Sequence, residues 1–541
     1  MPRTLIMQAR NTLQNLVKCA VLELQKKGNL PDVKVGEFKI EVPSQAGHGD
    51  YATAIALQIG AFSGKKPKRL AQILAKKLAE DKNVGKIASK IEVVAPGFVN
   101  FHLSGDFLRK ELLSIATKPD FGVRNIGRGK KINLEFVSVN PTGQLHVGHG
   151  RSAFYGDVLA RVLTSAGYNV TREYYVNNAR QSAQIRELGK TALKKGTSYK
   201  GPYLDKKIRI LAKRLKQYKS FEAAGYFLAD HIQRDIKVSL KKMGIAFDVW
   251  TKEDDLYKQN KVGKALKLLT KKKLVYDSEG ARWLKTSRYG DSQDQVIVRS
   301  SGEQTYFLSD IAYHYDKASR SFDRIIDIWG ADHQGHAKRM KAAMRIFGIR
   351  DLTILIAQLV RIRGGAKLSK RKGNIVTLED LVDTIGLDAA RYFYLTKSLD
   401  SQMEIDIALA RLKDQNNPIF YIQYTHARIC SIMRKSKEMG HIHNLVEKHM
   451  KYLTGDAEQE LMRKLAHFSE VVEDSARDYQ VHRLTTYLLE LSQLFNQFYR
   501  DHKVLTDEIM VRDARLTLTI ATGAVMRECL ELLGIEAPEK L

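Results

Sequence analysis

The chain has 541 residues, of which 44% are hydrophobic and 28% charged, a composition typical of a soluble globular protein. A single hydrophobic core rarely serves so long a chain, so we expect about three domains. Lys and Arg outnumber Asp and Glu by 89 to 60, a net charge of +29, and this excess favours a polyanionic partner, with nucleic acid as the leading candidate over a general role in solubility.

The cysteines argue against a disulfide framework and against a thiolate zinc site, because Cys19, Cys430 and Cys529 are far apart and form no CxxC pair. This usage fits a reducing compartment. No run approaches 18 apolar residues, so we expect no membrane span and a cytoplasmic location. The basic N-terminus resembles a transit peptide in charge, but its apolar residues continue at helical spacing past any plausible cleavage site, which favours a helix of the mature fold.

The pattern of elements divides the chain into three parts. Residues 1–115 mix helical patterns with short β-like runs and predict an α+β domain, followed by a linker over 118–131. Residues 116–400 alternate strands and helices, as in a doubly wound, Rossmann-like parallel sheet, with a lysine-rich and mainly helical insertion at about 182–300. Residues 401–541 show only amphipathic helical patterns and predict an all-α bundle. The strands of the sheet are expected at 131–139, 170–176, 324–330 and 352–360.

The run "FVSVNPTGQLHVGHGR", residues 136–151, joins the first of these strands to a helix. We expect that helix to begin near His149, with Phe154, Val158, Val162 and Leu163 on one apolar face. A helix N-terminus presents free backbone N–H groups to an anion such as phosphate. Gly148 and Gly150 leave room for a nucleotide, and His146 and His149 can add imidazole donors.

Three other interpretations of this run stay open on the residues alone. Gly148, Gly150 and Ala153 satisfy the dinucleotide-binding pattern GxGxxA, with Glu173 as the later acid, but "NPTGQLHV" separates the strand from the first glycine. The HxxH pair can ligate zinc but has no third ligand nearby. The run can also be a structural glycine-rich turn with capping histidines.

Two further segments carry candidate binding residues. "RIRGGAKLSKRKGN", residues 361–374, holds six cations and no acid in a stretch bounded by glycines. These cations repel one another, and a bound anion would reduce that repulsion. "IWGADHQGH" ends a predicted strand, which is where an open α/β sheet places its ligands, and carries Asp332, His333, Gln334 and His336.

In the order HVGH, GADH and KLSK the chain resembles the class I aminoacyl-tRNA synthetases, whose HIGH and KMSKS signatures match residues 146–149 and 367–371. Val147 is a conservative departure. More narrowly, the chain is similar to the arginyl-tRNA synthetases over nearly its whole length. The segments that carry this likeness are "EFVSVNPTGQLHVGHGR", "REYYVNNARQ", "TYFLSDIAYHYDK", "WGADHQGH", "DAARYF", "YIQYTHARI" and the N-terminal "VPSQAGHGDYATAIALQI".

The resemblance implies a two-step reaction, in which arginine and ATP give arginyl-adenylate and pyrophosphate, and the arginyl group then passes to tRNA. It assigns catalysis to His146, His149, Lys367 and Lys370. Gly148, His333 and Ser369 join them in binding ATP. Mg²⁺ is expected with the ATP phosphates, held by the substrate and water rather than by a protein cage.

The resemblance also implies the residues that recognise arginine and tRNA. Glu135, Tyr306 and Asp310 would contact the guanidinium, and Ser138, Asn140 and Gln334 would hold the amino-acid end. Such polar selection makes a separate editing site unnecessary. Contacts to tRNA are expected at the anticodon through Tyr421, Tyr424 and Arg428, and at the outer corner through Phe98 and Asn100.

Other functions remain as alternatives at this stage. They are a class I synthetase for another amino acid, a nucleotidyl transferase that charges a small metabolite, and a non-catalytic RNA-binding protein on the same fold. The intact signatures and the helical C-terminal region favour the arginine enzyme, for which we expect a monomer.

Overall fold

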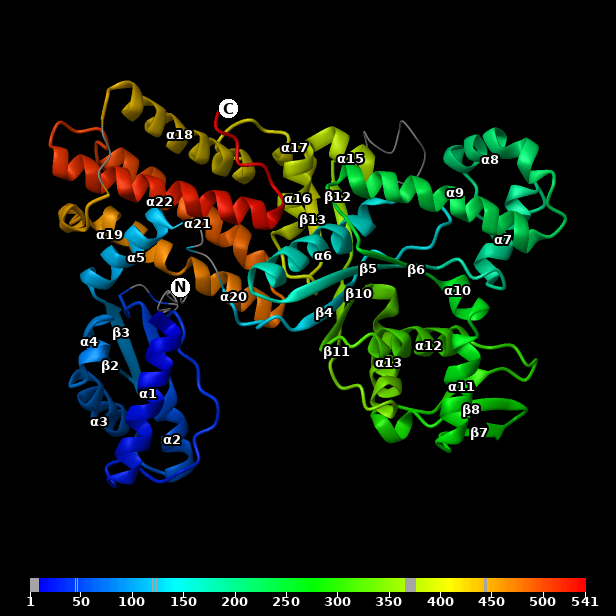
Figure 1. Cartoon of the computed structure of the whole chain (residues 1–541), viewed down its shortest axis with the longest axis horizontal. Helices are drawn as coiled ribbons and strands as arrows, with labels where there is room; N and C mark the ends of the chain where they lie inside the picture. Colours follow the sequence, from blue (N-terminus) through cyan, green and yellow to red (C-terminus); the bar gives the residue numbers. More distant parts are fainter. Residues whose placement is uncertain are drawn as a thin grey trace.

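The computed structural model describes residues 9–43, 45, 47–118, 121, 124–364, 376–441 and 445–541. The largest sheet lies in the middle of an elongated molecule, with the N-terminal domain and the C-terminal helices at one end and the insertion at the other (Figure 1). The predicted multidomain α/β architecture is confirmed. No helix in the described part of the chain is long and apolar enough to cross a bilayer.

The central sheet has five parallel strands in the order β11-β10-β4-β5-β6. Its chain order runs outward in both directions from β4, as in a doubly wound fold, and the ligand site of such a sheet lies at the carboxyl ends of the strands where the order reverses. The strands are β4 (Lys131–Glu135), β5 (Asn169–Val176), β6 (Val249–Lys252), β10 (Arg324–Gly330) and β11 (Leu352–Ala357).

Helix α6 (Val147–Ser165) follows β4 and is buried on almost every side. It packs against β5, β10, α15 (Leu378–Ile385), α16 (Leu387–Leu395) and two helices of the C-terminal region. The prediction of one apolar face was therefore too narrow, because Ala153, Tyr155 and Leu159 are buried as well. A helix that is covered all round has little freedom to shift, so the residues at its N-terminus are held firmly.

The insertion is less purely helical than predicted. Its helices are α7 (Ala183–Ala192), α8 (Pro202–Leu215), α9 (Phe221–Lys242), α10 (Glu253–Lys258) and α11 (Lys261–Lys271), and α12 (Tyr306–Ser319) follows it. Strand β6 returns to the main sheet in the middle of it, and β7 (Val275–Ser278), β8 (Ala281–Leu284) and β9 (Gln295–Val298) form a separate antiparallel sheet. The turn between β7 and β8 uses Glu279 and Gly280, both with positive φ, the conformation of a tight hairpin that the sequence reading missed.

The N-terminal domain is an antiparallel sheet, order β1-β3-β2, covered by helices. Its elements are α1 (Ala9–Lys26), β1 (Tyr51–Thr53), α2 (Ile55–Ser63), α3 (Pro67–Ala79), α4 (Lys82–Gly85), β2 (Ala88–Val94), β3 (Phe98–Leu103) and α5 (Gly105–Thr117). The expected linker after it is partly structural. Arg124 is buried, and its guanidinium donates to Glu528 (2.9 Å), to Ser165 and to the carbonyl of Ser469.

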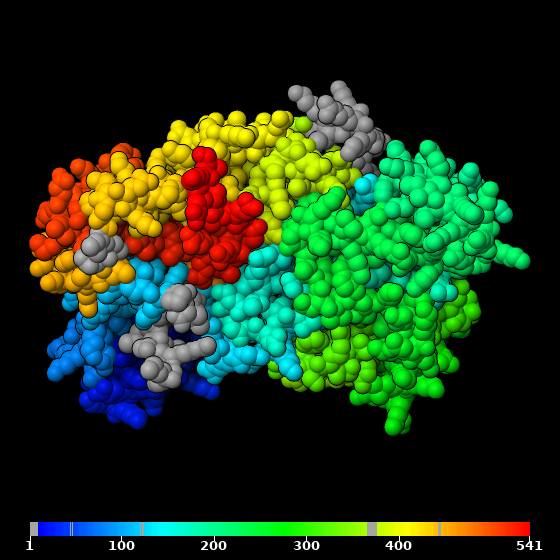
Figure 2. Space-filling view, turned by 45° about the horizontal axis from the view of Figure 1, so that its top comes forward, coloured from blue at the N-terminus to red at the C-terminus, as the bar shows by residue number. Residues whose placement is uncertain are grey.

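The C-terminal region is the predicted helical bundle. It contains α17 (Ile407–Ala410), α18 (Pro418–Glu438), α19 (Asp456–Ala466), α20 (Phe468–Asp478), α21 (His482–Asp501) and α22 (Ile509–Leu533). One short strand, β13 (Met403–Asp406), precedes it and pairs with β12 (Val360–Arg363), so strands do not stop at residue 400 as expected. The blue N-terminal domain lies beside the orange and red helices of this region in both views (Figures 1 and 2).

Candidate active site

The two histidines of the HVGH run form the start of α6. The Nδ1 atom of His146 accepts a hydrogen bond from the backbone N of Gly148 (3.1 Å), and the Nδ1 atom of His149 accepts one from the backbone N of His146 (3.2 Å). The two rings stack with centroids 3.5 Å apart. The helix thus begins before His149, because a histidine takes the capping role that Ser, Thr, Asp or Asn usually fills.

Both imidazoles are neutral donors in this arrangement. Burial lowers the pKa of His146, and burial together with the neighbouring ring lowers the pKa of His149 to about 3. A neutral imidazole whose Nδ1 accepts a hydrogen bond carries its proton on Nε2, so each ring keeps one N–H to donate. The histidine pair and the helix N-terminus together suit an anion such as a phosphate group.

Gly148 and Gly150 have different roles. A Cβ on Gly148 would lie 2.9 Å from the ring of His146, so glycine permits the histidine cap. A Cβ on Gly150 would lie 2.6 Å from the ring of Tyr394. Gly150 therefore allows α6 and α16 to pack closely, which corrects the expectation that it makes room for a nucleotide.

The chain that follows the KLSK run lies beside the histidines from residue 376 onward. The backbone N of Val147 donates to the carbonyl of Val376 (3.2 Å), and the N of Leu378 donates to the carbonyl of Leu145 (2.9 Å). Lys367, Ser369 and Lys370 themselves lie outside the described residues. Residues 376–378, which follow the KLSK run, are therefore held next to His146. This is the arrangement expected if the two runs belong to one site.

Strand β4 ends at Glu135, earlier than predicted, because the next residues turn sharply. Val137 and Ser138 have φ of 68° and 41°, a left-handed backbone that is uncommon outside glycine and is found often at functional sites. The hydroxyl of Ser138 accepts from the N of Tyr175 (3.0 Å), and its carbonyl accepts from the side chain of Asn177 (2.8 Å). Asn140 follows on the surface of the same turn.

Helix α12 presents Asp310 and Tyr306, the two residues that the resemblance assigns to the guanidinium. The carboxylate of Asp310 bonds the Nε2 of His336 (3.0 Å), whose ring stacks on Trp329. Tyr306 is 50% exposed, and its hydroxyl accepts from the backbone N of Ala183 at the start of α7 (3.1 Å).

Glu253 is a residue of this site that the sequence reading missed. It is the first residue of α10, directly after β6, and is 6% exposed. Its carboxyl accepts from the backbone N of Ala179 (3.3 Å), and burial together with the charge of Asp310 raises its pKa to about 7. The hydroxyl of Tyr175 is also buried here and has no hydrogen-bond partner among the described residues. Glu253 follows strand β6, which the sequence pattern did not predict, so no strand-end signal pointed to this residue.

Glu135 is placed differently from what the resemblance implies. Its buried carboxylate is paired with the ammonium of Lys317, which also bonds Asp327 (2.7 Å). The nitrogen Nε2 of His314 bonds the other oxygen of Asp327 (2.7 Å). Glu135 is thus occupied by a cation of this chain rather than open to a guanidinium.

Glu173 is likewise structural. It is fully buried, and both of its oxygens accept from Arg320 (3.0 and 2.9 Å), so it does not face a nucleotide ribose as the dinucleotide interpretation requires. His333 and Gln334, in contrast, are exposed at the end of β10, where they remain available to a ligand.

The residues expected to contact tRNA fall into two groups. Tyr424 (44% exposed) and Tyr499 (41% exposed) flank Arg428, whose guanidinium lies 4.8 and 5.2 Å from their ring centroids. We call these three residues the Tyr–Arg–Tyr stack; Tyr421 lies on the same helix and is partly buried.

The N-terminal pair is less accessible. Asn100 is 2% exposed and donates to the carbonyl of His48 (2.8 Å), so its side chain holds a loop and does not present itself to a large partner. Phe98 begins β3 and is partly buried.

The chain is similar to known proteins over nearly its whole length. Three family models match: the arginyl-tRNA synthetase N-terminal domain (residues 11–103), the catalytic domain of class I (R) tRNA synthetases (113–184 and 204–409) and the DALR anticodon-binding domain (422–541). The chain is 38% identical to the arginine–tRNA ligase of Desulforamulus reducens, over 99% of this chain and 100% of that protein, and 37% identical to that of Caldanaerobacter subterraneus over the same shares. The solved structure of Thermus thermophilus arginyl-tRNA synthetase shares the fold, with a TM-score of 0.80 and 21% identity over 98% of this chain and all of that one.

Proposed function

Because the chain belongs to the arginyl-tRNA synthetase family and joins arginine to tRNA at the expense of ATP, we propose how its residues divide that work. The carboxylate of arginine attacks the α-phosphorus of ATP, and the bond to the bridging oxygen breaks to release pyrophosphate. A hydroxyl of the terminal adenosine of tRNA then attacks the arginyl carbonyl, and AMP leaves. Both steps develop charge on phosphate oxygens, so positioned donors can supply most of the catalysis.

The histidine pair takes the phosphate end of ATP. His146 and His149 donate their Nε2–H groups to phosphate oxygens, and Gly148 lies against the adenosine. His333 completes this end from the turn that follows strand β10. Lys367, Ser369 and Lys370 bind the departing pyrophosphate. Support comes from the neutral, backbone-fixed imidazoles at the N-terminus of α6.

Asp310 and Glu253 take the guanidinium of arginine from two sides, and Tyr306 lies beside them. The observation that carries the proposal is the buried carboxyl of Glu253, whose pKa is raised to about 7 first by burial and then by the charge of Asp310, so that a bound cation would stabilise both carboxylates. A planar guanidinium satisfies both with parallel N–H donors, whereas lysine offers a point charge. Ser138, Asn140 and Gln334 hold the amino-acid end. Glu135 acts indirectly, by pairing with the buried ammonium of Lys317.

Mg²⁺ enters on the phosphates of ATP. There it is held by the substrate and by water. The Tyr–Arg–Tyr stack and Tyr421 contact the anticodon region of tRNA, and Phe98 lies near its outer corner. We place the enzyme in the cytoplasm and take it to act as a monomer.

Asp310→Asn tests the site directly. Loss of one partner of a charged hydrogen bond costs about 2–5 kcal/mol, so the KM for arginine should rise by between about 30-fold and a few thousand-fold in pyrophosphate exchange measured with tRNA present. The KM for ATP should stay near that of the wild type. Asp316→Asn, on the same helix and bonded to Lys261 (2.7 Å), is the matched control. Unchanged arginine kinetics in Asp310→Asn would remove Asp310 from the site.

A further inference from the structure

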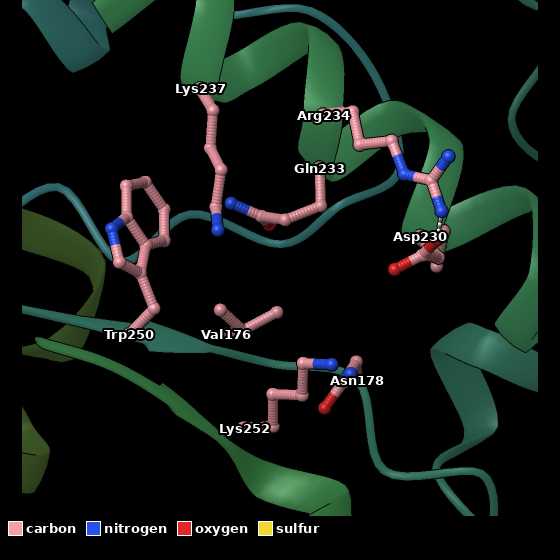
Figure 3. A pocket seen from close by; sticks show the side chains of 9 residues that line it. Val176, Asn178, Asp230, Gln233, Arg234, Lys237, Trp250 and Lys252 are labelled. Carbon is pink, nitrogen blue, oxygen red and sulfur yellow. Dashed lines mark hydrogen bonds and ion pairs between the residues drawn. The ribbon is translucent and has the colours of Figure 1, made fainter.

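A cavity of about 140 Å³ lies between α9 and the edge of the central sheet (Figure 3). It is lined from the sheet by Val176, Trp250 and Lys252 and from α9 by Gln233 and Lys237, with Asn178 beside the strand ends. A single water needs only about 10–15 Å³ of such volume, so the cavity has room for a small ion with several waters. None of the residues that we assign to ATP or arginine lines it.

Gln233 projects into this cavity and is 6% exposed. Neither its amide nitrogen nor its amide oxygen has a hydrogen-bond partner within the described part of the chain. The hydroxyl of Tyr174 lies close to this amide but is bonded to the backbone of Val139 (3.2 Å). A buried amide without a well-formed hydrogen bond favours a ligand that supplies one.

The charges around the cavity are unbalanced. Lys237 and Lys252 both line it, and partial burial together with the positive charge of Lys252 lowers the pKa of Lys237. The ammonium of Lys237 lies 4.1 Å from the ring centroid of Trp250. Neither lysine is paired with a carboxylate in the described structure, and the one acid of the cavity, Asp230, is already bonded to Arg234 (2.6 Å). Both lysines are exposed, so an anion that enters the cavity meets two solvated ammonium groups beside the buried amide of Gln233.

We propose that this cavity binds a phosphate dianion, either free or as the terminal monoester of an RNA chain, between Lys237 and Lys252 with Gln233 as a neutral partner. A dianion balances two ammonium groups, and its oxygens accept from the lysines and from the amide of Gln233. A hydroxyl of a monoprotonated phosphate can in turn donate to the amide oxygen. The site is separate from the one that binds ATP and does not rest on the proposed roles of the histidine pair.

The cavity also adjoins the arginine site through the backbone. Lys252 directly precedes Glu253, and Asn178, whose amide oxygen accepts from the N of Asp254 (3.2 Å), directly precedes Ala179, the partner of Glu253. An anion in the cavity therefore contacts the two chain segments that position Glu253.

The test uses the full-length enzyme with its ATP site filled by excess α,β-methylene-ATP. Titration of inorganic phosphate, followed by calorimetry and phosphorus NMR, should show one site. Lys237→Met and Gln233→Met should each weaken it by about tenfold or more, the loss expected for one charge-assisted or buried hydrogen bond. Lys241→Met removes the same charge one turn further along α9, outside the cavity, and should leave binding unchanged.

A second arm identifies the source of the phosphate. The affinity for tRNA with and without its 5′-terminal phosphate is compared in the wild type and in Lys237→Met. A difference that Lys237→Met abolishes supports the terminal monoester, and binding of inorganic phosphate alone supports the free ion.

The folded state provides a check on the variants. Because Gln233→Met removes an unpartnered polar group, its unfolding free energy in phosphate-free buffer should equal or exceed that of the wild type. Equal weakening by Lys237→Met and Lys241→Met, or the absence of binding in both arms, would overturn the proposal. Pyrophosphate exchange without added phosphate reports separately on the proposed active site.

Discussion

Glu253 carries a carboxyl group that is half protonated near neutral pH. Burial and the charge of Asp310 raise its pKa to about 7 from an ordinary value of 4.5. In the arginine-free enzyme this raised pKa contributes stability that is complete below about pH 4.5 and is lost as the pH rises through 7. A bound guanidinium reverses the preference, because it stabilises the charged form.

Arginine binding should therefore become tighter with rising pH. We expect the Kd for arginine to fall by up to about tenfold per pH unit between pH 5.5 and 7 and then to level off, as the proton no longer has to leave. Calorimetry across this range measures the effect. In Glu253→Gln binding should be weaker and its pH dependence should disappear; the same slope in this variant would assign the proton to another group.

At this scale the sequence predicts the types of residue better than their partners. Asp310 and Tyr306 could be chosen because they share a helix face and match a family segment. Glu135 could not be told from Glu253, because its partner Lys317 lies far along the chain and only the fold brings them together. Burial of Asn100 is invisible for the same reason.

At the scale of elements, the close approach of α6 and α16 depends on one missing side chain. Gly150→Ala would place a methyl group 2.6 Å from the ring of Tyr394, whose hydroxyl bonds the carbonyl of Val147. Overpacking of this kind costs about 1–3 kcal/mol. We expect a lower denaturation midpoint and, because the start of α6 shifts, a lower kcat for pyrophosphate exchange.

The control for this variant is Gly36→Ala, where an added Cβ meets no atom within 4 Å. A Gly150→Ala enzyme with the stability and kcat of the Gly36→Ala enzyme would show that the helix contact tolerates a methyl group.

The alternation of strands and helices could be predicted because each long element has a clear hydrophobic period. The pieces that were missed are short. Strand β6 and the β7–β9 sheet consist of four-residue strands in a lysine-rich region, and their identity depends on pairing across the fold. The histidine cap of α6 breaks the usual preference for capping residues, and such exceptions are expected at functional sites.

At the scale of the whole molecule, the net charge of +29 makes tRNA binding sensitive to salt. Arg428 pairs with no carboxylate among the described residues and lies between two exposed rings. Arg428→Ala should weaken tRNA binding, reduce the slope of log K against log salt by about 1, and leave the KM for ATP unchanged. Filter binding at salt concentrations from about 50 to about 300 mM measures this slope.

Arg483→Ala is the comparison for that experiment. Arg483 is already neutralised by two hydrogen bonds to Asp478 (both 2.6 Å), so its loss should change the slope little. Identical slopes for wild type and Arg428→Ala would exclude Arg428 from contact with phosphate.

The C-terminal helices are built into the catalytic core rather than tethered to it. Arg391 of α16 bonds Asp157 of α6 (2.9 Å), the carbonyl of Leu533 in α22 (3.2 Å) and that of Met243 after α9 (2.7 Å). The hydroxyl of Tyr155 in α6 bonds the carbonyl of Tyr479 (2.6 Å). A chimera that borrows the anticodon-binding half from a relative must therefore borrow the facing side of α6 as well, and a gene cut near residue 405 would split one core in two.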